Sequence, residues 1–103
     1  MSLIKTTTTL IIFCLFITTL AYTKTAEDYF NSGYVKAELK KYREAIQDYN
    51  KVIKLNPKDF EAYNNRGLTK ITSGQKDSGC LDLSKAGELG FAKAYEAIRE
   101  LCN

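Results

Sequence analysis

The chain has 103 residues, which is enough for one small domain, and its 45% hydrophobic and 26% charged residues are ordinary for a globular protein. The net charge of +3 is too small to indicate a nucleic-acid partner, and there is no histidine, the commonest metal ligand and general base. Without histidine, no Cys/His or Ser/His pair is available for nucleophilic catalysis, and no phosphate-binding loop is present. We therefore expect no enzyme, no metal site and no cofactor.

The first 21 residues have the layout of a secretory signal peptide. Lys5 gives a positive start, residues 10–21 form an apolar run of 12, and Thr19 and Ala21 are small residues that suit cleavage. The run is shorter than the roughly 18–20 apolar residues that span a bilayer. We predict export to the periplasm or the exterior, with no stable membrane span after cleavage. An uncleaved membrane anchor is the alternative.

Five helices are expected in the rest of the chain, over about residues 26–39, 42–56, 60–73, 75–88 and 91–102. Pro57 ends the second helix, because proline cannot continue a helix, and Asp59 can cap the third. Gly74 and Gly90 are expected to end the third and fourth helices. The fifth helix is amphipathic, with Tyr95 on its apolar face, so we expect it to cover the last pair of helices.

From residue 26 onwards the chain repeats itself with a period of 34 residues. Tyr29 returns as Tyr63, and Gly33 returns as Gly67. The same spacing relates Asn31 to Asn65, Tyr49 to Leu83, Lys51 to Lys85 and Val52 to Ala86. A fixed period of this length is typical of stacked helix–turn–helix units. We predict one domain over residues 26–103, with repeats over residues 26–59 and 60–93 and a capping helix over residues 91–102.

This pattern resembles the tetratricopeptide repeat (TPR) family, whose motif asks for an aromatic residue, small residues where two helices cross, a large residue and a closing proline. The first copy supplies Tyr29, Gly33, Ala45, Tyr49 and Pro57, and the second supplies Tyr63, Gly67, Gly79, Leu83 and Ala86. The second copy departs from the motif with Gly79 for alanine and Phe91 for proline. The resemblance implies an all-α superhelix of two TPR hairpins plus a capping helix. The end of the chain also resembles small exported bacterial members of the family.

The side chains of the second helix predict its buried face. An apolar stripe recurs at helical spacing, formed by Tyr42, Ala45, Ile46, Tyr49, Val52, Ile53 and Leu55. The acidic residues are expected on solvated helix surfaces. The same holds for the lysines at 36, 40, 41, 51, 54 and 58, which are interleaved with acids, although a membrane- or acid-facing patch is the alternative.

The TPR resemblance also implies a binding surface, because the first helix of each pair faces the concave side. That surface should receive Phe30, Asn31, Tyr34 and Glu38, then Glu61, Asn64, Asn65, Leu68 and Thr72. In family members that grip a partner's terminal carboxylate, asparagines stand where Asn31 and Asn65 stand. The basic partners of that clamp are missing, since Glu27 and Ala97 replace a lysine and an arginine and only Lys93 fits.

We therefore predict a polar groove that binds a protein or peptide, without the carboxylate clamp. The alternative is a structural or accessory subunit of a cell-envelope complex.

Cys80 and Cys102 are predicted to form a disulfide. Cys14 leaves with the signal peptide, so two cysteines remain in an oxidising compartment. They lie ten residues before and twelve residues after Gly90, at the same end of two antiparallel helices. Two buried free thiols are the alternative.

Overall fold

The part of the chain described by the computed structural model comprises residues 9–12 and 23–103, and its regular elements are all helices, without strands. The helices of the domain are α2 (Ala26–Glu38), α3 (Tyr42–Leu55), α4 (Phe60–Thr72), α5 (Lys76–Glu88) and α6 (Lys93–Leu101). The predicted signal peptide lies outside the described residues, apart from the helical residues 9–12. Within the described ranges, no helix has the length and apolar character needed to cross a membrane.

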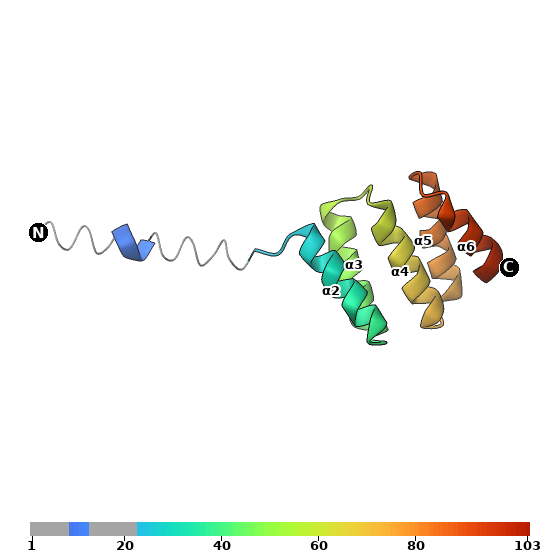
Figure 1. Ribbon diagram of the computed structural model, residues 1–103, viewed down its shortest axis with the longest axis horizontal. Coiled ribbons are helices and arrows are strands. Elements are labelled where there is room, and N and C mark those ends of the chain that lie inside the picture. Colours follow the sequence, from blue (N-terminus) through green and yellow to red (C-terminus); the bar gives the residue numbers. More distant parts are fainter. Residues whose placement is uncertain (1–8, 13–22) are drawn as a thin grey trace, which may run out of the picture.

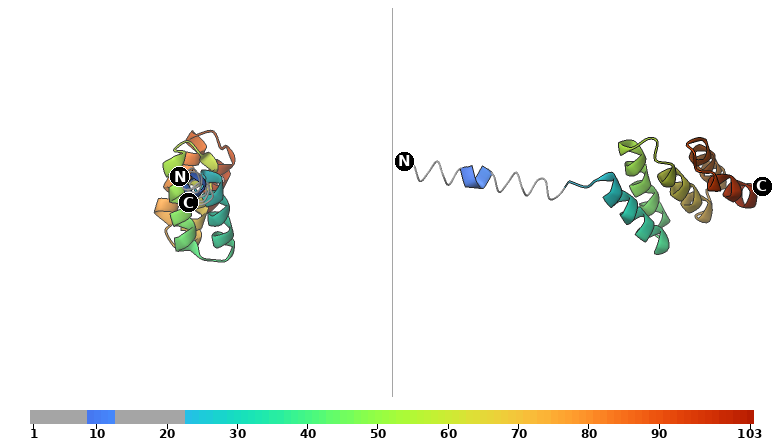
Figure 2. Two further views of the ribbon diagram at one scale, coloured as in Figure 1. Left: turned by 90° about the vertical axis from the view of Figure 1, so that its left-hand side faces the viewer. Right: turned by 45° about the horizontal axis from the view of Figure 1, so that its top comes forward.

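The five helices stand side by side in one row, in chain order (Figure 1). α2 packs on α3, α4 packs on α5, and the contact between α3 and α4 joins the two hairpins. α6 packs on α5 and closes the row, while α2 also touches α4. The same succession is visible when the molecule is turned by 45° (Figure 2). The predicted fold is therefore confirmed: two TPR hairpins and a capping helix in an α-α superhelix.

Side chains at the helix starts satisfy backbone groups that have no partner within the helix. The Thr25 hydroxyl accepts a hydrogen bond from the Asp28 N–H, and the Asp28 carboxylate accepts one from the Thr25 N–H. This reciprocal cap of α2 was not predicted from the sequence. Asp59 caps α4 as predicted, because its Oδ1 accepts a hydrogen bond of 3.1 Å from the Ala62 N–H.

Three turns place a residue in the left-handed backbone region. Gly74 and Gly90 have φ angles of 95° and 110°, which confirms their predicted role at the helix ends. Lys40 stands 34 residues before Gly74 and has a φ of 61°. The first hairpin thus makes the same turn as the second with a residue that carries a Cβ, which is unfavourable there.

The core lies along the seams between neighbouring helices. Its largest fully buried side chains are those of Tyr49, Val52 and Leu83, and the alanines at 45, 62, 86 and 94 are also fully buried. Leu55 is 58% exposed, so the prediction that it continues the buried stripe of α3 is wrong. It is the last residue of that helix, where the chain turns into the loop before α4.

The two hairpins use their small residues differently. Gly67 of α4 faces Gly79 of α5 directly, as the expected helix crossing requires. In the first hairpin, Gly33 lies against the ring of Tyr49, and a Cβ at Gly33 would be 3.0 Å from the Tyr49 Cε1. A large aromatic side chain therefore fills the space that backbone fills in the second hairpin.

α6 is attached to the second hairpin in three ways. It begins at Lys93, two residues later than predicted, because the Phe91 N–H still bonds the Ala86 carbonyl in the preceding turn. The Phe91 ring stacks on Phe60 of α4 with 5.3 Å between centroids. The predicted disulfide joins Cys80 to Cys102, whose Cα atoms lie 5.9 Å apart. The Tyr95 ring also covers Gly87, the last residue but one of α5.

Candidate binding groove

A groove of about 310 Å³ lies between α2 and α4, with residues of α3 behind it. Its walls and floor are formed by Tyr34, Ala37, Glu38, Tyr42, Tyr49, Asn65, Leu68, Thr69 and Thr72. Because the inner helices of both repeats contribute, the groove exists only when the two hairpins are stacked. We call it the α2–α4 groove.

Five of the nine residues predicted for the concave surface line this groove, namely Tyr34, Glu38, Asn65, Leu68 and Thr72. Phe30 is half-buried instead, with its ring edge-on to Tyr49 at 5.8 Å. Asn31 and Glu61 are exposed on the same helices without lining the groove. Asn64 is half-buried, and its Nδ2 lies 3.5 Å from the Asn65 Oδ1.

The floor of the groove contains the side chain of Tyr49, which is 1% exposed. Burial raises the pKa of Tyr49 to about 12, against the opposing effect of a side-chain hydrogen bond with Asn65. Tyr49 therefore stays neutral at physiological pH. Asn65 supports the floor as well as facing the groove, so it is more than the surface residue that the sequence suggested. Sequence reasoning placed Tyr49 in the core only and did not connect it with the groove.

Two threonines on the α4 side present polar atoms with fixed orientation. The Thr69 Oγ1 donates a 2.7 Å hydrogen bond to the Asn65 carbonyl, and the Thr72 Oγ1 donates a 2.9 Å bond to the Leu68 carbonyl. Because these hydroxyl protons are used within the helix, the oxygens remain free to accept hydrogen bonds. Glu38 is the one charged residue among those that line the groove. The α2–α4 groove thus combines aromatic and apolar area with hydrogen-bond acceptors. This combination can hold a ligand by both apolar contact and hydrogen bonds.

A buried carboxylate lies on the opposite side of the first hairpin. Asp48 is 6% exposed and receives hydrogen bonds of 2.8 Å from the Lys36 Nζ and 2.7 Å from the Ser32 Oγ. Burial alone would raise the pKa of Asp48, but these hydrogen bonds and the nearby positive charges of Lys36 and Lys51 outweigh burial and lower it below 3.8. The prediction of a solvated surface position is therefore wrong for Asp48, whereas the side chain of Lys36 stays 34% exposed beside it.

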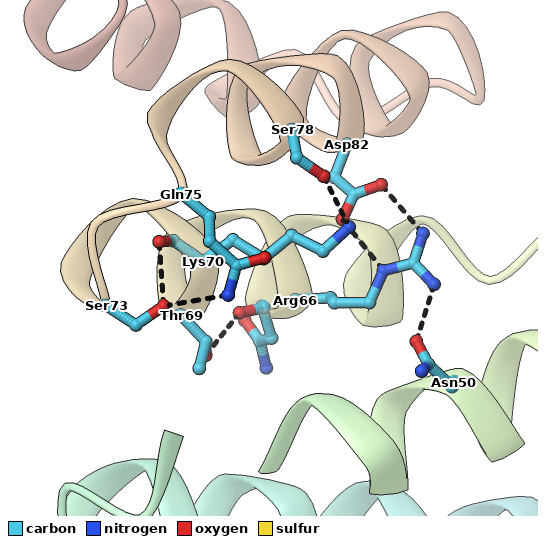
Figure 3. A network of polar contacts seen from close by, with 9 residues as sticks. Asn50, Arg66, Thr69, Lys70, Ser73, Gln75, Ser78 and Asp82 are labelled. Carbon is cyan, nitrogen blue, oxygen red and sulfur yellow. Dashed lines mark hydrogen bonds and ion pairs between the residues drawn. The ribbon is translucent and has the colours of Figure 1, made fainter. Parts of the chain in front are cut away.

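The second hairpin repeats this arrangement at Asp82, which is also 6% exposed (Figure 3). Arg66 binds Asp82 with two hydrogen bonds, from Nε at 2.8 Å and from Nη2 at 2.7 Å. The Lys70 Nζ lies 2.9 Å from the same carboxylate and donates to the Ser78 hydroxyl. Arg66 also reaches Asn50 of α3 at 2.8 Å, so one side chain connects three helices.

The 34-residue period contained the signal for these ion pairs. Asp48 corresponds to Asp82, and Lys36 corresponds to Lys70. A charge pair that recurs at repeat spacing indicates a shared structural position rather than scattered solvated charge. The pairs lie between helices of a hairpin, outside the set of residues that line the α2–α4 groove, and they hold the hairpins together.

Two further features of the surface bear on function. A second hollow, of about 320 Å³, is formed by Arg43, Ile46, Gln47, Ser73 and Gln75 and contains none of the predicted binding residues. Among residues 9–12 and 23–103, no group of three or more His, Cys, Asp or Glu side chains is placed to hold a metal ion.

Two stacked helix hairpins with a groove along their inner helices define a helical repeat domain. Residues 33–74 match the family model described as TPR repeat. The chain is 36% identical over 74 residues to the Hsp70-Hsp90 organizing protein of Triticum aestivum, covering 70% of this chain and 13% of that protein. It is 38% identical over 66 residues to Hsp70-Hsp90 organizing protein 3 of Arabidopsis thaliana, covering 62% of this chain and 12% of that protein.

A third relative is the tetratricopeptide repeat-containing protein trd-1 of Caenorhabditis elegans, which is 40% identical over 48 residues, 47% of this chain and 6% of that protein. The chain thus spans about an eighth or less of the length of these relatives. No solved structure matches it significantly. The family match and the relatives support the assignment of this chain to the tetratricopeptide repeat family.

Proposed function

We propose that this chain is a non-catalytic module that binds a protein or peptide partner in the α2–α4 groove. The observation that carries the proposal is the groove itself, in which two inner helices present Tyr34 and Leu68 beside Glu38 and Asn65. Tyr34 is 53% exposed although it is large and partly apolar. Exposed aromatic area beside fixed polar groups is characteristic of protein-binding surfaces.

The relatives support the general class of this activity. Two of them are named for organising Hsp70 and Hsp90, so their TPR segments belong to proteins that work on other proteins. From these relatives we carry over only the general class of activity, the binding of other proteins. We do not carry over the family's carboxylate clamp, because Glu27 and Ala97 occupy two positions where that clamp has basic residues.

A pair of adjacent substitutions tests the proposal. Tyr34 and Val35 are 53% and 54% exposed on the same helix, but only Tyr34 lines the groove. The full chain is used to capture proteins from an envelope extract of the cells that make it, and captured proteins are quantified by mass spectrometry. We expect Tyr34→Ala to reduce the specific capture about tenfold, as for a binding hot spot, and Val35→Ala to leave it unchanged. Equal effects of the two variants would contradict the proposal.

A second candidate is a structural subunit that docks through the end of the row. Leu81 of α5 is 72% exposed, and Leu101 of α6 is 38% exposed. In this case the capture would survive Tyr34→Ala and would be lost in Leu81→Ser. Folding of each variant is checked by its thermal melt.

We further propose that the mature domain is exported. The proposal rests on the apolar run over residues 10–21 and on the disulfide between Cys80 and Cys102, which suits an oxidising compartment. The intact mass of the protein recovered outside the cytoplasm tests it. Cleavage after Ala21 is expected, an uncleaved mass in the membrane fraction would indicate an anchor, and recovery from the cytoplasm alone would contradict export.

A further inference from the structure

The inner face of α2 and α4 carries acidic residues beyond the groove. The groove residues Tyr34 and Glu38 define the inward direction of α2, and Glu27 lies seven residues before Tyr34, two helical turns away on the same face. On α4, Glu61 stands seven residues before Leu68 in the same way. Both glutamates are exposed.

These carboxylates are available to a ligand. The ion pairs among the described residues engage Asp48 and Asp82 and leave Glu27, Glu38 and Glu61 out. The basic residues of both inner helices, Lys36 and Lys70 included, point to the opposite side, where they bind the buried aspartates. The inner face of the two hairpins is therefore acidic although the chain carries a net charge of +3.

The third inner helix differs in charge. Arg99 of α6 follows Asn31 and Asn65 at the 34-residue spacing, and Lys93 lies at the start of the same helix. α6 also carries Glu96 and Glu100, so it has as many acidic as basic residues, whereas the exposed charges on the inner face of α2 and α4 are acidic. A cationic ligand would therefore be attracted to the part of the inner face formed by α2 and α4 more strongly than to α6.

Given the proposed function, we infer that the occupant of the α2–α4 groove is an extended, cationic segment of the partner protein. Glu27 and Glu38 are eleven residues apart on α2, which corresponds to about 16 Å of helix. An extended chain covers that length in about five residues. The segment therefore carries two lysines or arginines about five residues apart, with an apolar or aromatic residue between them that meets Tyr34 and Leu68.

This occupant is opposite in charge to a terminal carboxylate. A negatively charged chain end would meet Glu38 within the groove and Glu27 where a clamp lysine would stand. The unpaired glutamates would repel it, whereas they complement a basic segment.

A library of random nine-residue peptides, with both ends blocked, provides the test. It is passed over the immobilised full chain, over Tyr34→Ala, over the triple variant Glu27→Gln, Glu38→Gln, Glu61→Gln, and over a control triple variant. The control, Glu44→Gln, Glu88→Gln, Glu100→Gln, removes the same charge from exposed positions outside the groove. Retained peptides are sequenced, and the dissociation constant of the most enriched one is measured.

We expect the full chain and the control to enrich lysine and arginine, and the first triple variant to lose that preference and to bind the selected peptide about tenfold more weakly. Higher salt should weaken binding by the full chain. Peptides that depend on Tyr34 but are neutral or acidic would overturn the inference and leave the proposed function intact. If the variant Glu27→Gln, Glu38→Gln, Glu61→Gln still enriches lysine and arginine, the inference is likewise overturned and the proposed function is left intact. If Tyr34→Ala retains the same peptides as the full chain, both proposals fail.

Discussion

Gly67 and Gly79 face each other across α4 and α5, each so close to the other's backbone that a side chain is excluded. A Cβ at Gly79 would lie 2.6 Å from the Gly67 carbonyl oxygen, and a Cβ at Gly67 would lie 2.8 Å from the Gly79 carbonyl oxygen. Because each neighbour is backbone, neither helix can relieve the clash by changing a rotamer. The distance between α4 and α5 is therefore set by these two glycines.

This contact reverses what helix propensity alone predicts for Gly79→Ala. In a solvated helix that change would stabilise by about 1 kcal/mol. Here we expect a loss of about 1–3 kcal/mol from overpacking, measured by urea unfolding. Gly87→Ala is the matched control, because its neighbour is the ring of Tyr95, which is 49% exposed and can move. A stabilised Gly79→Ala variant would show that the helices separate easily.

The turn at Lys40 offers a stabilising substitution. Its φ of 61° is unfavourable for a residue with a Cβ, and glycine stands at the equivalent position 74. We expect Lys40→Gly to raise the free energy of unfolding by about 0.5–1 kcal/mol, since relief of strain exceeds the entropy cost of glycine. Lys41→Gly, at a residue with a φ of −88°, should destabilise instead. Chemical denaturation of both variants distinguishes these results.

The buried ion pair of Asp48 predicts an acid-dependent loss of stability. Its pKa is lowered in the folded protein, so the pair contributes fully above the unfolded value of 3.8 and loses its contribution as the pH falls through the folded pKa. Unfolding free energies measured between pH 7 and pH 2 should fall below pH 4 in the wild type. Asp48→Asn should be less stable at pH 7, because Lys36 loses its partner, and should show a shallower decline. An identical acid profile for both proteins would contradict this reading.

The raised pKa of Tyr49 predicts a loss of stability at high pH. Its pKa of about 12 exceeds the ordinary value of 10, so the folded state keeps a proton that the unfolded state has lost. Stability should therefore fall as the pH rises from 10 towards 12, by about 1.4 kcal/mol per pH unit. Tyr49→Phe should remove this part of the decline. Stability measured at pH 8 serves as the reference for both proteins.

The disulfide should stabilise the domain through the unfolded chain. Cys80 and Cys102 are 22 residues apart, and closing a loop of that size contributes about 3 kcal/mol in the chain-entropy model. We expect the double variant Cys80→Ser, Cys102→Ser to lose about that amount and to be insensitive to reductant. Titration of the denatured wild-type chain without residues 1–21 should find no free thiol, and two free thiols per chain would refute the bridge.

Deleting residues 91–103 should unfold the domain rather than shorten it. The deletion removes Ala94, which is fully buried against the second hairpin, and the ring of Phe91 that stacks on Phe60. Two TPR units without a cap are fewer than such arrays usually need. The truncated chain, with Cys80→Ser to avoid a free thiol, should show no cooperative melt by circular dichroism. An unchanged transition would contradict the capping role of α6.

The sequence by itself determined the helices, their pairing and the disulfide. Helical periodicity, Pro57 and the glycines at 74 and 90 act within one or two turns of chain, so they are readable without a tertiary structure. The 34-residue period then implied two equal hairpins, and antiparallel packing placed Cys80 and Cys102 at one end. Five of the residues that line the groove, Tyr34 and Leu68 among them, were predicted from the resemblance to the TPR family, in which the first helix of each pair faces the concave side.

Only the tertiary structure decided which polar side chains are buried and what forms the floor of the groove. Asp48 and Asp82 have the residue type of a solvated helix surface, and their burial depends on cations supplied by the preceding helix at sequence separations of 12 to 16 residues. Tyr49 likewise reaches the groove because Gly33 leaves room for its ring. These outcomes arise from contacts between helices, and helical periodicity specifies a face of one helix without specifying the atoms that the neighbouring helix brings to it.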